Sequence, residues 1–202
     1  MDKHELVERV ILDEWNAFDK VKNEGGRADC QDNWNTFHLM RASQYNVWTQ
    51  EMLLQYAEDF EMSMEAGWNP IMEKYGRMEI STSPESYEKI KDSLPVLSEE
   101  KLTIIEEIVR IQVAWMEAFA ETYPKMAVNA RSIHTYEDNP FNTSYETYLR
   151  GELQTYSDEM LAMYGAFVVE IARKGDNLAY MIMEQTAKLY GYSSIDDVEK
   201  NL

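Results

Sequence analysis

Three charged residues occupy positions where the helical pattern of this sequence would place apolar side chains. Glu14, Arg41 and Glu152 each have apolar or aromatic residues three or four positions away on both sides. A buried charge without a partner is strongly destabilising, so residues of this kind must pair with one another or with a ligand. The pattern therefore predicts that two acids and one arginine converge in the interior.

Two interpretations of these charges remain open. In the first, Glu14, Arg41 and Glu152 form a buried ion-pair network that only fixes the register of the helices. In the second, they line a polar pocket between helices, where an amine, carboxylate or guanidinium of a ligand completes the pairing. Whether the protein is an enzyme is left open; if it is one, Glu14 or Glu152 is the candidate general base.

Two further polar residues are candidates for the mouth of this pocket. Arg27 follows two glycines, and an arginine near a helix N-terminus gathers positive potential that suits an anion, although an exposed loop arginine explains it equally well. Gln44 is placed beside it. Cys30 could be a nucleophile at a helix start, but no base for it is identifiable, so a small buried thiol is the favoured interpretation.

Motifs for metals and cofactors are missing from the sequence. Helical bundles that hold two iron ions use Glu-x-x-His pairs, whereas the residues three before the three histidines are Met1, Asn35 and Arg131. A single cysteine excludes a multi-cysteine site. There is no glycine-rich phosphate loop, serine elbow or dinucleotide fingerprint. We therefore predict no metal and no cofactor, although a site made of carboxylates alone stays open.

The charge balance argues against two classes of partner. The 202 residues include 19 Lys and Arg against 37 Asp and Glu, a net charge of −18, which repels phosphate backbones and anionic lipid surfaces. Nucleic acid and membranes are therefore not expected partners, whereas a small polar metabolite or a second copy of the chain remains open. Without an apolar leader or a run of about 18 apolar residues, the sequence predicts a cytoplasmic protein.

The apolar spacing is helical throughout, without strand-like alternation. We predict an all-α fold over residues 1–202, a single-domain helical bundle of about four long helices plus several short ones. The expected elements are a helix over 3–23, a helix of about 35 residues that ends before Gly67, a crossover over 67–97 with one short helix, a helix from Ser98 to near Pro124, a helix that Thr143 begins and Gly175 ends, and a last helix to about Tyr190.

Two segments carry a resemblance to a known family. They are GGRADCQDNWNTFHLMRASQ (25–44) and NPFNTSYETYLRGELQTYS (139–157), with EWNAF (14–18) upstream. Together they resemble the bacterial proteins catalogued as domain of unknown function 4125. The resemblance implies a bacterial, soluble, single-domain protein and transfers no activity. Its motifs overlap Glu14, Arg27, Arg41 and Glu152.

The leading hypothesis is a protein that binds a small polar ligand in an interhelical pocket lined by Glu14, Arg41 and Glu152. The alternative is a helical interaction or regulatory module, in the form of a homodimer, whose exposed tryptophans and methionines make a contact surface. In that case the buried charges are purely structural.

Overall fold

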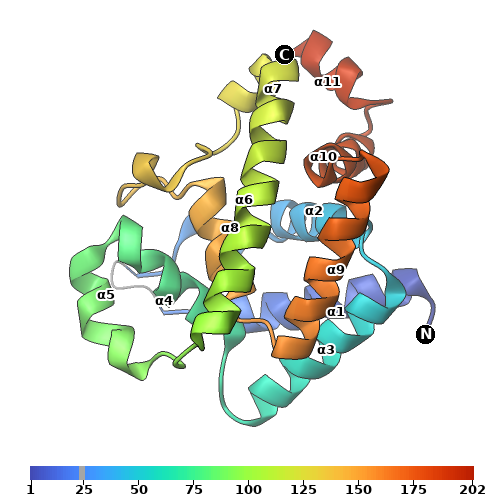
Figure 1. The fold of residues 1–202 in the computed structure, drawn as a ribbon. Helices are drawn as coiled ribbons and strands as arrows, with labels where there is room; N and C mark the ends of the chain where they lie inside the picture. The colour runs from blue at the N-terminus through green and yellow to red at the C-terminus, as the bar shows by residue number, and fades with distance from the viewer. Residues whose placement is uncertain (23–25) are drawn as a thin grey trace. The chain divides into compact units, whose positions relative to one another are not determined.

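The computed structural model describes residues 1–22 and 26–202, and these residues form helices joined by short connections (Figure 1). The all-α prediction is confirmed. Residues 23–25, where we expect the first helix to end, lie outside the described residues. None of the helices in the described ranges is long and apolar enough to cross a bilayer.

The contacts between residues divide the chain into two compact units. The first contains Met1–Met72 and Met181–Ile195, and the second contains Glu73–Tyr180 and Asp196–Leu202. The prediction that residues 1–202 form a single domain stays a prediction, and each unit is described below by itself.

The first unit is built on three helices, with α1 packed against the other two. A capping box starts α1, because Asp2 accepts a hydrogen bond from the backbone N–H of Glu5 while the Glu5 side chain accepts one from Asp2. Between α1 and α2, the rings of Phe18 and Phe37 stack with centroids 5.5 Å apart. The elements are α1 (Lys3–Phe18), η1 (Asp29–Asp32), α2 (Trp34–Tyr45) and α3 (Gln50–Glu65).

The predicted helix of about 35 residues is wrong, because the chain breaks between α2 and α3. The Thr49 hydroxyl accepts a hydrogen bond from the backbone N–H of Met52 and so begins α3 without any glycine or proline. Trp48, which is 1 % exposed, packs edge-on against Tyr45 of α2 and Tyr56 of α3. The cap of α2 is Asn33, and the predicted 3–23 helix already ends at Phe18.

The second unit is centred on α6, which contacts α7, α8 and α9. The predicted start of α6 after Ser98 and its end near Pro124 are confirmed, and Ile104 on this helix is 41 % exposed. The helices of this unit are α5 (Pro84–Ile90), α6 (Glu99–Thr122), α7 (Pro124–Val128), α8 (Tyr145–Leu153) and α9 (Asp158–Lys174), with the 3-10 turns η2 (Lys91–Ser93) and η3 (Thr135–Glu137). Helices α4 (Pro70–Thr82), α10 (Leu178–Leu189) and α11 (Ile195–Asn201) each have residues in both units.

Two predictions for the second unit need correction. The 67–97 crossover holds not only a short helix but also α4, a helix of 13 residues. The helix predicted from Thr143 to Gly175 is two helices, because Ser157 caps α9, and its first cap is Ser144 rather than Thr143. The end of α9 is as predicted, since Gly175 takes the left-handed conformation with a φ of 75°.

Helix α8 packs on α4 at very short range. A Cβ atom on Gly151 would lie 2.8 Å from Met78 Cγ and 3.2 Å from the backbone oxygen of Lys74. Only a residue without a side chain allows this approach, so Gly151 sets the spacing of the two helices that carry the pocket described below.

Candidate functional site

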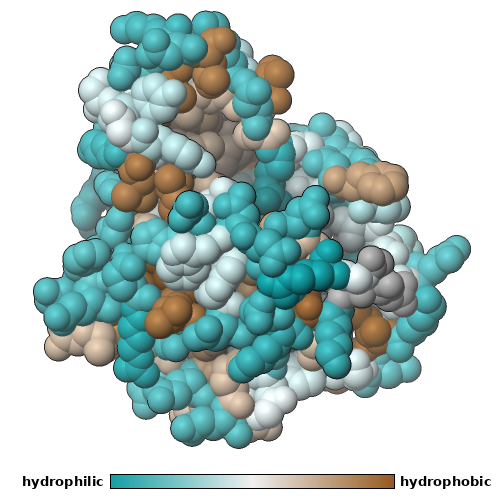
Figure 2. Space-filling view, turned by 180° about the vertical axis from the view of Figure 1, so that it is seen from behind, coloured by the Kyte–Doolittle hydropathy of each residue, from teal (hydrophilic) through white to brown (hydrophobic). Residues whose placement is uncertain are grey.

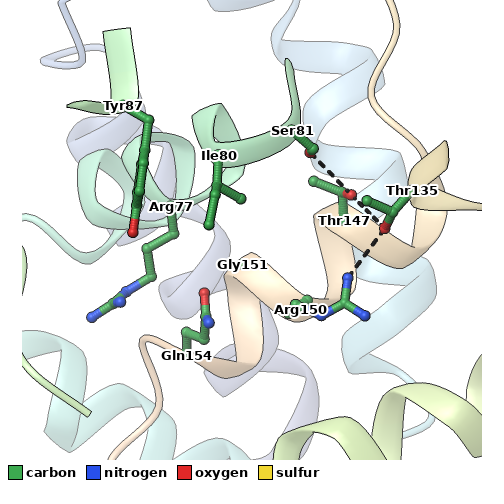
Figure 3. Close-up of a pocket in the computed structure, with 9 residues that line it drawn as sticks. All are labelled: Arg77, Ile80, Ser81, Tyr87, Thr135, Thr147, Arg150, Gly151 and Gln154. Carbon is green, nitrogen blue, oxygen red and sulfur yellow. Dashed lines mark hydrogen bonds between the residues drawn. The ribbon is translucent and has the colours of Figure 1, made fainter. Parts of the chain in front are cut away.

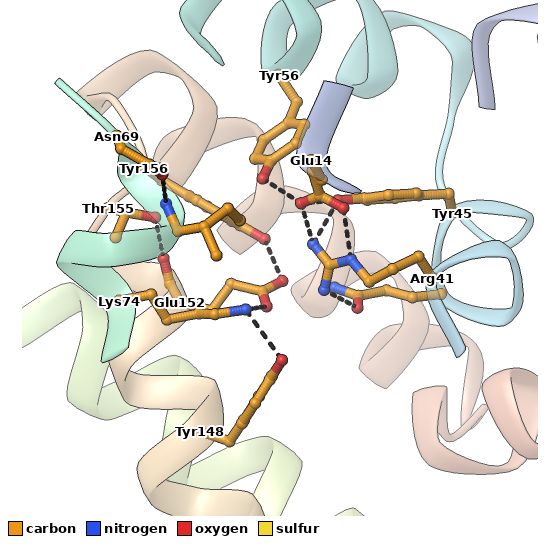
Figure 4. A network of polar contacts seen from close by, with 12 residues as sticks. Glu14, Arg41, Tyr45, Tyr56, Asn69, Lys74, Tyr148, Glu152, Thr155 and Tyr156 are labelled. Atoms are coloured by element: carbon orange, nitrogen blue, oxygen red, sulfur yellow. Dashed lines mark hydrogen bonds and ion pairs between the residues drawn. The ribbon is translucent and has the colours of Figure 1, made fainter. Parts of the chain in front are cut away.

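The first buried charge network lies in the first unit and is centred on Glu14 (Figure 4). The Glu14 side chain is completely buried. Its Oε2 accepts a hydrogen bond from Arg41 Nε at 2.7 Å, and its Oε1 accepts one from Arg41 Nη2 and one each from the hydroxyls of Tyr45 and Tyr56 at 2.7 Å. The structure thus brings Glu14 and Arg41 together, as their positions on the apolar stripes suggest.

Both oxygens of Glu14 are therefore occupied by donors from α2 and α3. Four hydrogen bonds on one carboxylate make a clamp that joins three helices, because each donor belongs to a helix other than α1. Gln44 belongs to the same cluster, since its Oε1 accepts a hydrogen bond from Arg41 Nη1 at 3.0 Å.

Arg27 is an exposed arginine whose guanidinium is held by two carboxylates. Its Nε donates to Asp32 at 2.8 Å, and its Nη2 donates to Asp19 and to the backbone oxygen of Gln31 at 2.7 Å. The hydrogen bonds that Arg27 donates to Asp32 and then to Asp19 raise its pKa above the ordinary value. Cys30 is exposed, which corrects the expectation of a buried thiol.

Glu152 lies in the second unit, where it pairs with a lysine that the sequence interpretation missed. Its Oε2 is 3.5 Å from Lys74 Nζ, and its Oε1 accepts from the Tyr156 hydroxyl at 3.2 Å (Figure 4). Lys74 also donates to the Tyr148 hydroxyl at 3.0 Å. Both charged side chains are buried. The prediction that Glu152 joins Glu14 and Arg41 in one pocket stays a prediction.

A second buried pair on α4 was also missed, because the 67–97 segment was interpreted as a crossover. Arg77 Nε donates to Glu73 at 2.7 Å, and Arg77 Nη2 donates to the backbone oxygen of Pro95 at 2.8 Å. The Arg77 side chain is only 9 % exposed and that of Glu73 6 %. The spacing of four residues between opposite charges is the signal that could have indicated both the helix and the pair.

A pocket of about 100 Å³ lies between α4, α5, η3 and α8 of the second unit (Figure 3). Most of its lining residues have polar side chains, which are two arginines, three hydroxyl side chains, a tyrosine and a glutamine. The lining residues are Arg77, Ile80, Ser81, Tyr87, Thr135, Thr147, Arg150, Gly151 and Gln154.

One side of this pocket is a continuous chain of hydrogen bonds (Figure 3). Arg150 Nη1 donates to Thr135 Oγ1, which lies 2.9 Å from Thr147 Oγ1, and both Thr147 and Ser81 donate to Asp138. Burial opposes the ionisation of Asp138, but the hydrogen bonds from Ser81, Thr147 and Ser144 outweigh it and lower its pKa. These hydroxyls are therefore already engaged.

Arg150 on the same side is fully compensated by acids. It makes a bidentate pair with Glu106 at 2.6 and 3.0 Å and a third contact with Glu146 at 2.7 Å. Burial lowers the pKa of Arg150, but the hydrogen bonds to Glu106 and Glu146 raise it more, so the net shift is upward. This arginine has little charge left for a ligand.

The other side of the pocket is different, because three polar groups there have unused hydrogen-bonding capacity. Arg77, Tyr87 and Gln154 gather at this side (Figure 3). Arg77 Nη1, the Tyr87 hydroxyl and the Gln154 side-chain amide make no hydrogen bond to any described residue, although Arg77 uses its other two nitrogens. Donors from α4, α5 and the residue after α8 thus face one small cavity.

The exposed hydrophobic residues bear on the alternative hypothesis, in which tryptophans and methionines form a contact surface for another protein. One face of the molecule is mainly hydrophilic, with hydrophobic side chains in small separate groups (Figure 2). The tryptophans expected to form a contact surface are mostly covered: Trp48 is buried, and Trp34, at 36 % exposed, is the one tryptophan among the large exposed hydrophobic residues of the described ranges. Methionines are exposed at several positions, Met40 and Met62 among them.

Comparison with known proteins finds a match to one family. The model of a family described as "Protein of unknown function (DUF4125)" matches residues 4–200. No curated protein and no solved structure matches the chain.

Proposed function

We propose, for a chain that belongs to this family of unknown function, that the protein binds a small polar ligand in the pocket between α4, α5 and α8. One observation carries the proposal: Arg77, Tyr87 and Gln154 line one cavity, and Arg77 Nη1, the Tyr87 hydroxyl and the Gln154 amide make no hydrogen bond to a described residue. A small number of convergent polar groups with unused hydrogen-bonding capacity in one concave site is typical of a ligand pocket.

The size of the cavity limits the ligand. A volume of about 100 Å³ corresponds to roughly three water molecules at about 30 Å³ each. We therefore propose a ligand, or a ligand portion, with a similar number of non-hydrogen atoms. Ile80 and the ring of Tyr87 supply the apolar part of the lining.

The buried charges of the sequence hypothesis have a different role in this proposal. Glu14 has no unoccupied oxygen, and Glu152 is paired with Lys74 and Tyr156. We propose that both carboxylates stabilise helix packing, and that Arg27, Gln44 and Arg41 are not ligand contacts. The pocket lined by Glu14, Arg41 and Glu152 is the competing proposal.

A thermal-shift screen against a metabolite library tests the proposal. A ligand at 100 times its dissociation constant stabilises the fold by roughly 2.7 kcal/mol. The variant Gln154→Leu is expected to lose the shift, because it removes both polar atoms of an unpaired amide. Gln185→Leu is the matched control, since Gln185 is also half-buried, has no side-chain hydrogen bond to a described residue and lies outside the pocket.

The two proposals give opposite results in this screen. If a stabilising compound acts equally on the wild type and on Gln154→Leu but not on Arg41→Met, the ligand belongs to the Glu14–Arg41 cluster and the α4–α8 pocket is not its site. A shift that survives in Gln185→Leu and disappears in Gln154→Leu supports the pocket.

A further inference from the structure

We infer that the ligand meets the Arg77 side of the pocket with an uncharged, planar edge of the carboxamide type, a carbonyl oxygen beside an N–H group. This inference rests on the proposed function and adds the chemical class of the ligand.

The charge of Arg77 is already neutralised. Glu73 lies 2.6 Å from Arg77 Nη2, and both side chains are nearly buried. A ligand carboxylate at Nη1 would be attracted by the guanidinium but repelled by the Glu73 carboxylate that is already paired with it. It would also lose its hydration in a protein whose net charge is −18. An arginine with one carboxylate partner and one unused nitrogen is therefore a poor anion site.

The same nitrogen is a good donor to a neutral carbonyl oxygen. Arg77 Nε and Nη2 are engaged by Glu73 and Pro95, so the two-pronged contact typical of carboxylate recognition is not available. A single hydrogen bond from Nη1 to a carbonyl oxygen requires no second charge. An ammonium group is excluded from this position, because Arg77 offers only donors.

The Gln154 side chain adds both donors and an acceptor to the single donor that Arg77 offers. Its primary amide offers two donor hydrogens and an acceptor oxygen, none of them used within the part of the chain that the structure describes. The edge of a ligand amide complements both Arg77 and Gln154. Its carbonyl oxygen can accept hydrogen bonds from Arg77 Nη1 and from the Gln154 amide nitrogen, and its N–H can donate to Gln154 Oε1. The Tyr87 hydroxyl can donate or accept, so it accommodates either end of that edge.

Three compounds that share one ring test the inference: benzamide, benzoate and benzylamine. Each presents, on the same ring, a polar head group of two or three non-hydrogen atoms, a size that suits the cavity. We would titrate them into the full chain labelled with ¹⁵N-glycine and follow the amide signal of Gly151, which lines the pocket, with Gly165 on α9 as the reference. Benzamide is expected to shift Gly151 at a concentration at least tenfold lower than the other two compounds.

The variants and the three possible results separate this inference from the proposed function. Gln154→Leu is expected to weaken benzamide at least tenfold, whereas Gln185→Leu leaves it unchanged. If benzoate or benzylamine shifts Gly151 as readily as benzamide does, the amide assignment is overturned and the pocket stands. If none of the three shifts Gly151 up to its solubility limit, both the assignment and the pocket proposal are overturned.

Discussion

Arg41 in the first unit and Arg77 in the second are both largely buried arginines, and each is paired with a glutamate. They differ in how many hydrogen-bonding groups around them already have partners. Around Glu14 every carboxylate oxygen has donors, and the result is a closed clamp. At Arg77, which lines a cavity with Tyr87 and Gln154, Nη1 makes no hydrogen bond to a described residue. A buried charge thus indicates a function only where its pairing is incomplete.

Arg41→Met is expected to give the largest effect, because it leaves the Glu14 carboxylate buried with only two tyrosine donors. Breaking a buried pair by removing one partner costs about 3–5 kcal/mol. Urea denaturation followed by circular dichroism measures this loss. The double variant Glu14→Gln with Arg41→Met removes the lone charge, so it is expected to recover part of the stability. A loss below about 1 kcal/mol in the single variant would show that the clamp is not structural.

Gly151→Ala is expected to cost about 1–3 kcal/mol, because the new methyl group would lie 2.8 Å from Met78 Cγ and push α8 away from α4. Gly165→Ala is the matched control on α9, where the added Cβ would meet Ile108 Cδ1 at 3.4 Å, an ordinary contact. A helical alanine is favoured over glycine by up to about 1 kcal/mol, so the control should be neutral or stabilising. Equal effects in the two variants would contradict the close approach of α4 and α8.

Asp138→Asn is expected to cost about 1–2 kcal/mol at pH 7, because three donors point at one carboxylate. The folded state lowers the pKa of Asp138, so its contribution is complete above the unfolded pKa of about 3.9 and is lost as the pH falls through the lower folded value. The gap between the wild type and Asp138→Asn in urea midpoints should therefore shrink below about pH 4. Asp176→Asn, at an exposed aspartate without a side-chain hydrogen bond to a described residue, is the control.

Much of the helical pattern could be predicted from the sequence, since Glu14, Arg41 and the glycine end of α9 stand out against a regular apolar spacing. The break after α2 could not be predicted from the sequence. The Thr49 hydroxyl caps a new helix instead of letting α2 continue, and the burial of Trp48 among residues of α2 and α3 favours the turn. Local sequence carries no signal for that tertiary contact.

The pocket was harder to predict than the clamp for a physical reason. Tyr87 and Gln154 are polar residues at ordinary half-exposed positions, and they matter only because Gly151 lets α8 approach α4. Glu73 and Arg77 were recognisable by their spacing, but the hydrogen bond that Arg77 donates to the Pro95 carbonyl, 18 residues along the chain, was not. That Arg77 Nη1 makes no hydrogen bond to a described residue is a property of the packed structure and of no single segment.

Gln154→Leu gives the smallest expected change in stability and the sharpest test of the contrast between the two arginines. Because the Gln154 amide has no hydrogen bond to a described residue, its removal should alter the free energy of unfolding by no more than about 0.5 kcal/mol in the absence of ligand. Urea denaturation of the ligand-free protein measures this, with Gln185→Leu beside it. A loss above about 1 kcal/mol would mean that Gln154 is part of a closed network like that of Glu14, and the difference between the two regions would disappear.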